Sequence, residues 1–177
     1  MPQVFVAAGS NVAPQEHMAL ATRALQRAFA DVRFSPWYRN PAVGFAGADF
    51  INLVAGFTTT LTVEQLLSEL RAIEALCGRP RDAARWAPRS MDLDVLLYGD
   101  LVCQQPGLTL PRPDLLVRAY MLGPLNDIAP HVRHPQTGQT IGQHWQHFDQ
   151  RAHPLERMPC DPTSPRSDPH RPPESGP

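Results

Sequence analysis

The sequence predicts an α+β domain, and three observations support this class. The chain has 177 residues with 42% hydrophobic side chains, enough for one core and therefore one domain. Apolar residues recur at helical spacing over 14–30 and 61–77, whereas short apolar runs over 4–8, 50–57 and 92–98 indicate strands. The order up to residue 100 is strand, helix, strand, strand, helix, strand. It predicts a ferredoxin-like two-layer sandwich, with helices packed on one face of an antiparallel sheet.

The first strand leads into the first helix through polar residues. Val4 to Ala8 is apolar, and the sequence predicts a turn at Gly9, followed by Ser10 and Asn11 as candidate helix caps. A glycine before a helix start also occurs in phosphate-binding loops, but the full glycine-rich fingerprint is missing here. A plain turn is the favoured interpretation.

The next two strands enclose a loop of unusual composition. Residues 32–38 alternate into a strand that Pro36 kinks or places at an edge of the sheet. Residues 40–47 form a loop with apolar side chains, which is typical of a loop that lines a site. Asn52 is out of character in the strand of residues 50–57, because a buried amide needs hydrogen-bond partners. It either bonds neighbouring backbone or offers a donor and an acceptor to the edge of a heterocycle.

The second helix runs from about Leu61 to Cys77. Thr62 is its candidate N-cap, and Gly78 is the residue at which it ends. Arg71 and Glu74 lie one turn apart on this helix. They form either a surface ion pair, which is the usual case, or the beginning of a nucleotide site.

Two aspartates stand at the beginning of the fourth strand. Side chains alternate across a strand, so Asp92 and Asp94 project from one face about 7 Å apart, whereas Leu93, Val95 and Leu97 point to the other face. Asp is disfavoured in strands, and two carboxylates on one face are suited to a divalent cation with phosphate oxygens as further ligands. The alternative is a strand that frays into solvent.

A cationic loop precedes these carboxylates. Four arginines lie in it, namely Arg79, Arg81, Arg85 and Arg89. Pro80 and Pro88 keep the segment out of a helix. Mutual neutralisation of arginines and aspartates is one interpretation. The other is a cationic loop beside a metal-binding pair, which suits a polyphosphate ligand.

The composition excludes several classes of protein. The net charge of −1 provides no basic field for nucleic acid or an anionic membrane, so small-molecule partners are expected. All 16 basic residues are Arg, which excludes a Walker A loop, a protein-kinase lysine and Schiff-base chemistry. Any phosphate must therefore be bound by arginines.

Cysteine usage and hydropathy indicate the compartment. Cys77, Cys103 and Cys160 form an odd set without metal-ligand spacing, which favours a reducing cytoplasm. The sequence shows neither a signal-peptide pattern at the N-terminus nor an apolar run long enough to cross a membrane. We expect a soluble, unprocessed protein.

The C-terminal half changes composition near residue 150. Short helices are predicted over 112–120 and 121–128, and another contains His144. Residues 151–177 hold 8 of the 20 prolines and almost no large apolar side chains. The prediction is a single domain over 1–150 and a Pro-rich disordered tail over 151–177.

The motif around the aspartates resembles a known family. The run Arg85-Trp-Ala-Pro-Arg89-x-x-Asp92-Leu-Asp94-Val-Leu is similar to the signature of 6-hydroxymethyl-7,8-dihydropterin pyrophosphokinase, an enzyme of folate biosynthesis. The resemblance extends less tightly from Val4 to about His147. It implies transfer of the pyrophosphoryl group of ATP to the pterin hydroxymethyl group, with release of AMP.

The resemblance also implies roles for individual residues. It implies that Asp92 and Asp94 bind two Mg²⁺ ions. The implied catalytic residues are these two aspartates together with Arg79 and Arg89. Pterin contacts fall to Pro41, Val43, Phe50, Asn52, Trp86, Asp92 and Tyr120. ATP contacts fall to Arg71, Glu74, Arg81, Arg85, Trp86, Thr109, Arg112 and Arg118.

Three positions depart from the family pattern, and two other functions are compatible with the carboxylates. Phe50 stands where the family has Tyr, Tyr120 where it has Phe, and Arg112 where a His is common. A catalytically weakened binding module would keep the fold, but the retained carboxylates and arginines argue against it. A metal-dependent phosphohydrolase would direct the same carboxylates at water, and it leaves Asn52 and the aromatic residues unexplained. We expect a monomer.

Overall fold

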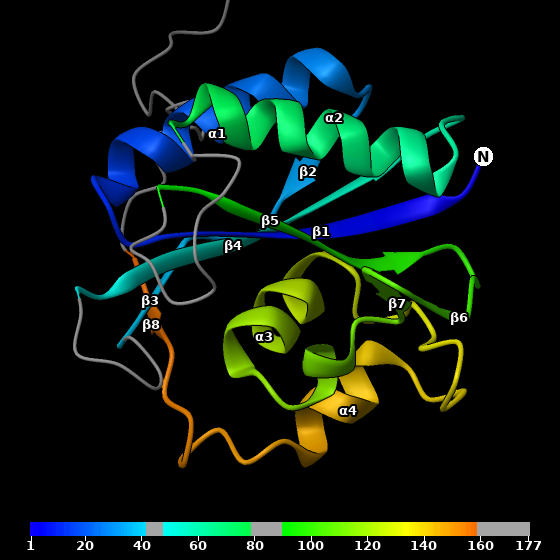
Figure 1. Cartoon of the computed structure of the whole chain (residues 1–177). Helices are drawn as coiled ribbons and strands as arrows, with labels where there is room; N and C mark the ends of the chain where they lie inside the picture. Colours follow the sequence, from blue (N-terminus) through cyan, green and yellow to red (C-terminus); the bar gives the residue numbers. More distant parts are fainter. Residues whose placement is uncertain (42–47, 79–89, 159–177) are drawn as a thin grey trace, which may run out of the picture.

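The computed structural model describes residues 1–41, 48–78 and 90–158. The first part of the chain contains β1 (Gln3–Ser10), α1 (Pro14–Ala28), β2 (Arg33–Phe34), β3 (Tyr38–Asn40), β4 (Phe50–Thr58), α2 (Val63–Leu76) and β5 (Asp92–Tyr98) (Figure 1). The second part contains β6 (Cys103–Gln105), β7 (Leu108–Leu110), the short 3₁₀ helix η1 (Pro113–Leu116), α3 (Ala119–Ile128), α4 (Ile141–His147) and β8 (Glu156–Arg157).

The main sheet is antiparallel throughout, as predicted. Its order is β5-β1-β4-β3-β8, and β2 pairs with β4 beside β3. The predicted strand over residues 32–38 is therefore two short strands, because Ser35-Pro36-Trp37 interrupts the ladder. β6 and β7 form a separate hairpin.

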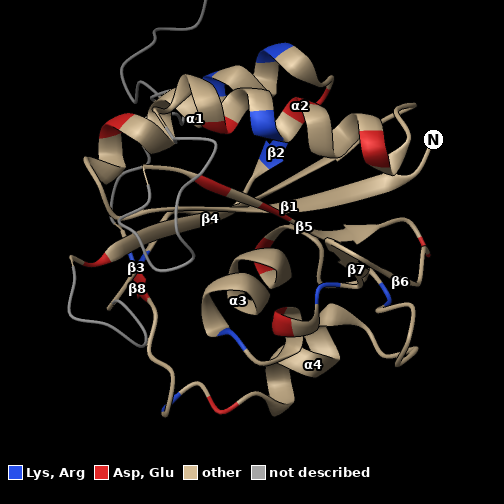
Figure 2. Cartoon of the chain, viewed as in Figure 1, with Lys and Arg blue, Asp and Glu red and all other residues tan. Residues whose placement is uncertain are grey.

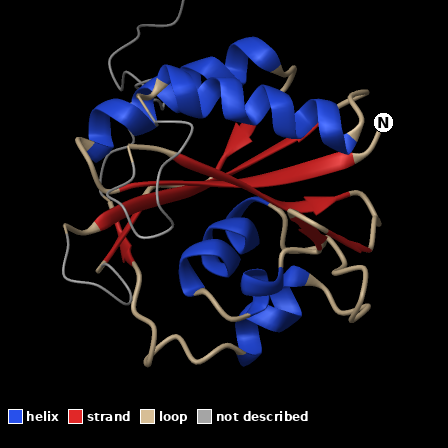
Figure 3. Ribbon diagram, viewed as in Figure 1, coloured by secondary structure: helices blue, strands red, loops and turns tan. Residues whose placement is uncertain are grey.

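Helices cover both faces of the sheet (Figure 3). Helices α1 and α2 pack on one face over a core that includes Val6, Leu53 and Leu66. Helices α3 and α4 cover the other face over a second core that includes Phe5 and Leu122. The predicted α+β sandwich is confirmed for the first 100 residues, and the C-terminal helices add a layer on the face that the prediction left bare.

A bulge in the pairing of β1 with β5 corrects one predicted side-chain direction. The register shifts between Phe5 and Val6, so Val6 pairs with Val95 and Phe5 with Leu97. Val95 belongs to the core under α1 and α2, whereas Leu97 packs into the core under α3 and α4. An extra residue in one strand reverses the alternation beyond it, which a strict period of two does not anticipate.

The two long helices begin differently. The predicted N-cap Thr62 is confirmed: its side chain accepts a hydrogen bond from the Gln65 backbone N–H, and the Gln65 side chain reciprocates. The N-cap of α1 is instead Ala13 in the left-handed conformation, with no side-chain cap. The Ser10 hydroxyl, predicted as a cap, donates to the Val12 carbonyl at 3.2 Å.

The structure differs from the prediction for residues 151–158. Glu156 and Arg157 form β8, which pairs with β3, and the Met158 N–H donates to the Trp37 carbonyl at 2.9 Å. Met158 also packs against the core under α1 and α2. The sheet thus includes residues beyond 150, and the rest of the predicted tail, 159–177, lies outside the described residues.

Candidate active site

One row of residues crosses the three central strands. Gly9 of β1 pairs with Asn52 of β4 on one side and with Asp92 of β5 on the other. Directly opposed residues in neighbouring strands share a face of the sheet. Neighbouring strands lie about 5 Å apart, so Asn52 and Asp92 stand roughly 10 Å apart with Gly9 between them.

Gly9 leaves the floor between these two side chains open. A Cβ at Gly9 would lie 2.7 Å from Asn52 Oδ1, closer than real Cβ contacts allow. The Asn52 amide therefore leans over Gly9, into space that any other residue would fill. The predicted turn at Gly9 is wrong, because β1 extends to Ser10. A glycine inside a strand indicates close approach by another group, and this signal was available in the sequence.

A second asparagine fixes the Asn52 amide. Asn52 Nδ2 donates to Asn40 Oδ1, and Asn40 Nδ2 donates to the Pro41 carbonyl at 2.9 Å. Both side chains are buried, with exposed fractions of 6% for Asn52 and 7% for Asn40. Among the described residues the partner of Asn52 is thus a side chain and not neighbouring backbone. Asn40 was missed in the sequence because its role depends on strand pairing.

Tyr38 extends the row on the far side of Asn52. It pairs with Asn52 across β3 and β4, and its hydroxyl donates to Asp127 Oδ2 in α3 at 2.6 Å. Burial, followed by the bond to Asp127, raises the pKa of Tyr38 well above its ordinary value. The tyrosine therefore remains neutral and ties α3 to the strand beside Asn52.

The two aspartates share the face that α3 covers. Asp94 pairs with Ala7, whose side chain belongs to the core under α3 and α4. Both carboxylates are partly buried, in the acidic part of β5 that Figure 2 marks within the central sheet. The predicted common face of Asp92 and Asp94 is confirmed, and the alternative of a strand that frays into solvent is excluded.

Glu74 reaches the same strand from the opposite layer. Its Oε1 accepts the backbone N–H of Leu93, between the two aspartates, at 2.8 Å. Glu74 thereby anchors the beginning of β5 to α2. Arg71, on the same helix, is exposed.

Basic residues meet the aspartates from the segment that leads into α3. Arg112 Nη1 lies 2.8 Å from Asp94 Oδ1, and Arg112 Nε lies 3.6 Å from Asp114 Oδ2. Arg118 Nε lies 4.0 Å from Asp114 Oδ1. This nitrogen is buried and has no hydrogen-bond partner within the described parts of the chain. Arg112 and Arg118 thus place two guanidinium groups beside the aspartates.

Tyr120 lies in the field of this cluster. The pKa of its hydroxyl is raised, mainly by burial. Of the nearby charges, those of Arg118 and Arg112 lower this pKa, whereas those of Asp114 and Asp94 raise it. Its ring packs at the margin of the core that contains Phe5 and Leu122. The structure thus brings Tyr120 to the same face of the sheet as the aspartates.

The donor set suits a hard divalent cation. Asp92 and Asp94 provide carboxylate oxygens on one face, and Mg²⁺ is commonly held by one or two carboxylates together with substrate phosphates. No group of three or more His, Cys, Asp or Glu side chains that could hold a metal occurs in the described ranges. The two carboxylates therefore fit a metal that arrives with phosphate better than a closed structural metal site.

The other predicted site residues are placed as follows. Phe50 begins β4, Thr109 lies in the β6–β7 hairpin, and Pro41 is exposed at the end of β3. Six residues lie outside the described ranges, namely Val43, Arg79, Arg81, Arg85, Trp86 and Arg89.

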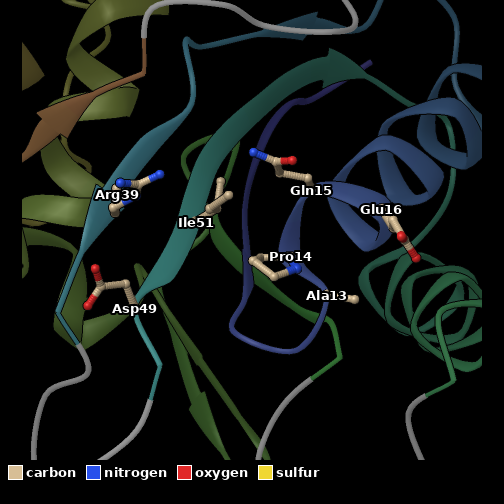
Figure 4. Close-up of a pocket in the computed structure, with 7 residues that line it drawn as sticks. All are labelled: Ala13, Pro14, Gln15, Glu16, Arg39, Asp49 and Ile51. Carbon is tan, nitrogen blue, oxygen red and sulfur yellow. The ribbon is translucent and has the colours of Figure 1, made fainter.

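A separate groove of about 360 Å³ lies by the start of α1 (Figure 4). It is lined by Ala13, Pro14, Gln15, Glu16, Arg39, Asp49 and Ile51. Ile51 belongs to the core under α1 and α2, and Arg39 is its direct partner in β3. The groove is thus on the face opposite to Asn52 and the aspartates, and it contains no predicted site residue.

Comparison with known families identifies the family of this chain. The sequence model of the 7,8-dihydro-6-hydroxymethylpterin-pyrophosphokinase family matches residues 5–130. The chain belongs to this family. The stretch includes the strand row, the aspartates and the cluster around Arg112, so the resemblance predicted from the motif is confirmed. Members are pyrophosphokinases, which makes the chain an enzyme, a diphosphotransferase.

Individual relatives agree with this membership. The chain is 42% identical over 137 residues to the 2-amino-4-hydroxy-6-hydroxymethyldihydropteridine pyrophosphokinase of Pseudomonas aeruginosa. The aligned region covers 75% of this chain and 84% of that protein. It is 38% identical over 141 residues to the enzyme of the same name from Synechocystis, with coverage of 78% and 72%.

Solved structures share the fold. The wild-type HPPK-DHPS protein of Plasmodium falciparum matches with a TM-score of 0.65 at 12% identity, over 85% of this chain and 45% of the other. An HPPK-DHPS protein in complex with substrates matches with a TM-score of 0.64 at 11% identity, over 82% and 43%. The chain thus spans less than half of these longer proteins, and the likeness concerns the fold. No helix within the described ranges is long and apolar enough to span a bilayer.

Proposed function

We propose that this chain transfers the pyrophosphoryl group of ATP to the hydroxymethyl group of 6-hydroxymethyl-7,8-dihydropterin and releases AMP. The row of Asn52, Gly9 and Asp92 is the observation that supports this assignment best. It combines a fixed amide, an open floor and a carboxylate, which together suit a flat heterocycle with a hydroxyl at one end. A phosphohydrolase has no need of the amide or of the open floor, and the family match does not favour that alternative.

The pterin lies over Gly9 in this proposal. One Asn52 amide hydrogen is committed to Asn40, so the second hydrogen and Oδ1 are directed at the heterocycle. Phe50 and Tyr120 supply aromatic surface, and Pro41 and Val43 come from the loop after β3. Asp92, across Gly9, lies beside the hydroxymethyl group.

The nucleotide lies on the Arg112 side of Asp94. The hydroxymethyl oxygen loses its proton to solvent and forms a bond to the β-phosphorus, the bond from this phosphorus to the α,β-bridging oxygen breaks, and AMP leaves with the electron pair. Asp92 and Asp94 would hold two Mg²⁺ ions, which would supply positive charge to neutralise the charge that develops on the transferred group. Arg112, Arg118 and Thr109 bind the nucleotide. Glu74 acts mainly by anchoring β5.

The segment over 79–89 carries further roles in this proposal. Arg79 and Arg89 stabilise the transferred group, Arg81, Arg85 and Trp86 contact the nucleotide, and Arg71 approaches from α2. These roles rest on family membership, and their positions lie outside the described residues except that of Arg71. Neither nucleic acid nor a membrane is a partner, the chain is a monomer, and the reducing cytoplasm is its compartment.

Nucleotide chromatography after incubation with ATP, Mg²⁺ and the pterin tests the reaction. We expect AMP in a pterin-dependent manner. Asp92→Asn keeps the shape of the side chain but removes its charge, so AMP formation should fall by at least about 10²-fold, as expected when a metal ligand is lost. ADP, or pterin-independent release of phosphate, would reject the assignment in favour of an ordinary kinase or a hydrolase.

A further inference from the structure

Arg112 occupies one oxygen of a carboxylate that the proposed function needs for metal. Its Nη1 lies 2.8 Å from Asp94 Oδ1, which is the distance of a direct, charge-assisted hydrogen bond. The side chains are 35% and 23% exposed, so solvent screens the pair only in part. The Arg112 backbone N–H is also fixed, because it donates to the Leu96 carbonyl at 2.9 Å.

A guanidinium and a divalent cation are incompatible on the same carboxylate oxygen. They compete for the lone pairs of Asp94 Oδ1, and they repel each other at close range. Metal binding at Asp94 Oδ1 therefore requires Arg112 to turn away, and at Oδ2 the guanidinium weakens metal binding by charge repulsion. The carboxylate of Asp114 offers a second position, because it already lies 3.6 Å from Arg112 Nε.

We propose that Arg112 is a positioning residue that couples metal binding to nucleotide binding, an inference that rests on the proposed function. In the free protein Arg112 holds Asp94 and keeps the affinity for metal alone low. A bound nucleotide offers phosphate oxygens to Arg112, which releases Asp94 for the metal. By reciprocity, metal strengthens nucleotide binding by the same factor.

An Arg at position 112 makes the competition for Asp94 independent of pH. An Arg is always charged and forms a rigid fork, so it remains a competitor for Asp94 at every physiological pH. Arg118 does not substitute for it. Among the described residues, the ion pair of Arg118 is with Asp114, at 4.0 Å.

Mn²⁺ binding, followed by electron paramagnetic resonance, tests the coupling without turnover. The probes are Mn²⁺ alone and Mn²⁺ with α,β-methylene-ATP, whose α,β linkage cannot be cleaved. We expect weak binding of Mn²⁺ alone to the wild-type protein and much tighter binding with the nucleotide. Arg112→Gln should tighten the binding of Mn²⁺ alone at least about fivefold, the lower end of typical coupling between linked sites. It should also shrink the effect of the nucleotide.

Three further variants test whether the effect on Mn²⁺ binding comes from the charge of Arg112 and from the carboxylate of Asp94. Arg112→Lys retains the charge and should keep the affinity for Mn²⁺ alone within about twofold of the wild type. Arg39→Gln removes one exposed charge from the opposite face of the sheet and should change nothing. Asp94→Asn should abolish the tight Mn²⁺ signal. Retained binding in Asp94→Asn would place the metal elsewhere and overturn the proposal.

Unchanged or weaker binding of Mn²⁺ alone in folded Arg112→Gln would also overturn it, since the competing cation would then not be Arg112. Circular dichroism establishes whether each variant is folded, and Asp94→Asn remains informative if the glutamine variant is not. The outcome is separate from the pterin assay. Absence of AMP with intact Mn²⁺ coupling would reject the proposed reaction alone, whereas AMP formation without coupling would reject only the role of Arg112.

Discussion

Replacement of Gly9 by alanine should disrupt the site through a single steric contact. The added Cβ would lie 2.7 Å from Asn52 Oδ1 and 3.8 Å from its Cγ, so the buried amide must move. Overpacking of this kind costs about 1–3 kcal/mol. Disturbance of the bond between Asn52 and Asn40 adds roughly 0.5–1.5 kcal/mol. A chain of this size loses about 2–4 °C in Tm per kcal/mol, so Gly9→Ala should melt roughly 3–18 °C lower.

A double-mutant cycle with Asn52→Ala measures this effect. Asn52→Ala removes the clashing Oδ1, and the nearest remaining contact is Phe50 Cδ1 at 3.9 Å, an ordinary van der Waals distance. Gly9→Ala should therefore cost less than about 0.5 kcal/mol in that background. Denaturant unfolding of the four proteins gives the coupling. Equal costs of Gly9→Ala in both backgrounds would show that Asn52 does not use the space over Gly9, and the proposed pterin floor would be wrong.

Three other predictions concern stability. Truncation after Gln150 should lower Tm because β8 and the packed Met158 are lost, whereas truncation after Met158 should retain Tm; equal melting of the two proteins would show that β8 contributes nothing. Burial lowers the pKa of His134 below its ordinary value of 6.5. Near pH 6.5 the folded state thus binds fewer protons than the unfolded state. The contribution of His134 to the free energy of unfolding should be present above pH 6.5 and should be lost as the pH falls towards the lower pKa of the folded state. His134→Leu should flatten this dependence in urea unfolding at several pH values, and an unchanged slope would contradict it. Tyr38→Phe removes the bond to Asp127 and should cost about 1–2 kcal/mol of unfolding free energy, with no cost expected in an Asp127→Ala background.

The elements and the acidic pair could be predicted because their signals are local. The order of strands and helices up to residue 100 follows from apolar periodicity, and Thr62 follows from its own side-chain chemistry. Asp92 and Asp94 share a face because they are two residues apart in a strand, whatever the rest of the chain does. The motif that contains them also identified the family, since a continuous sequence pattern requires no knowledge of contacts.

The pairing of distant residues was decided only by the tertiary structure. Gly9 acquires its role from the register that sets it between Asn52 and Asp92, and the bulge near Leu97 belongs to the same pairing. The side of the sheet covered by α3, and the contact of Arg112 with Asp94, likewise depend on how the chain returns after β7. A local pattern specifies which way a side chain points along its own strand. Its neighbours across the sheet depend on register and packing, which are properties of the whole fold.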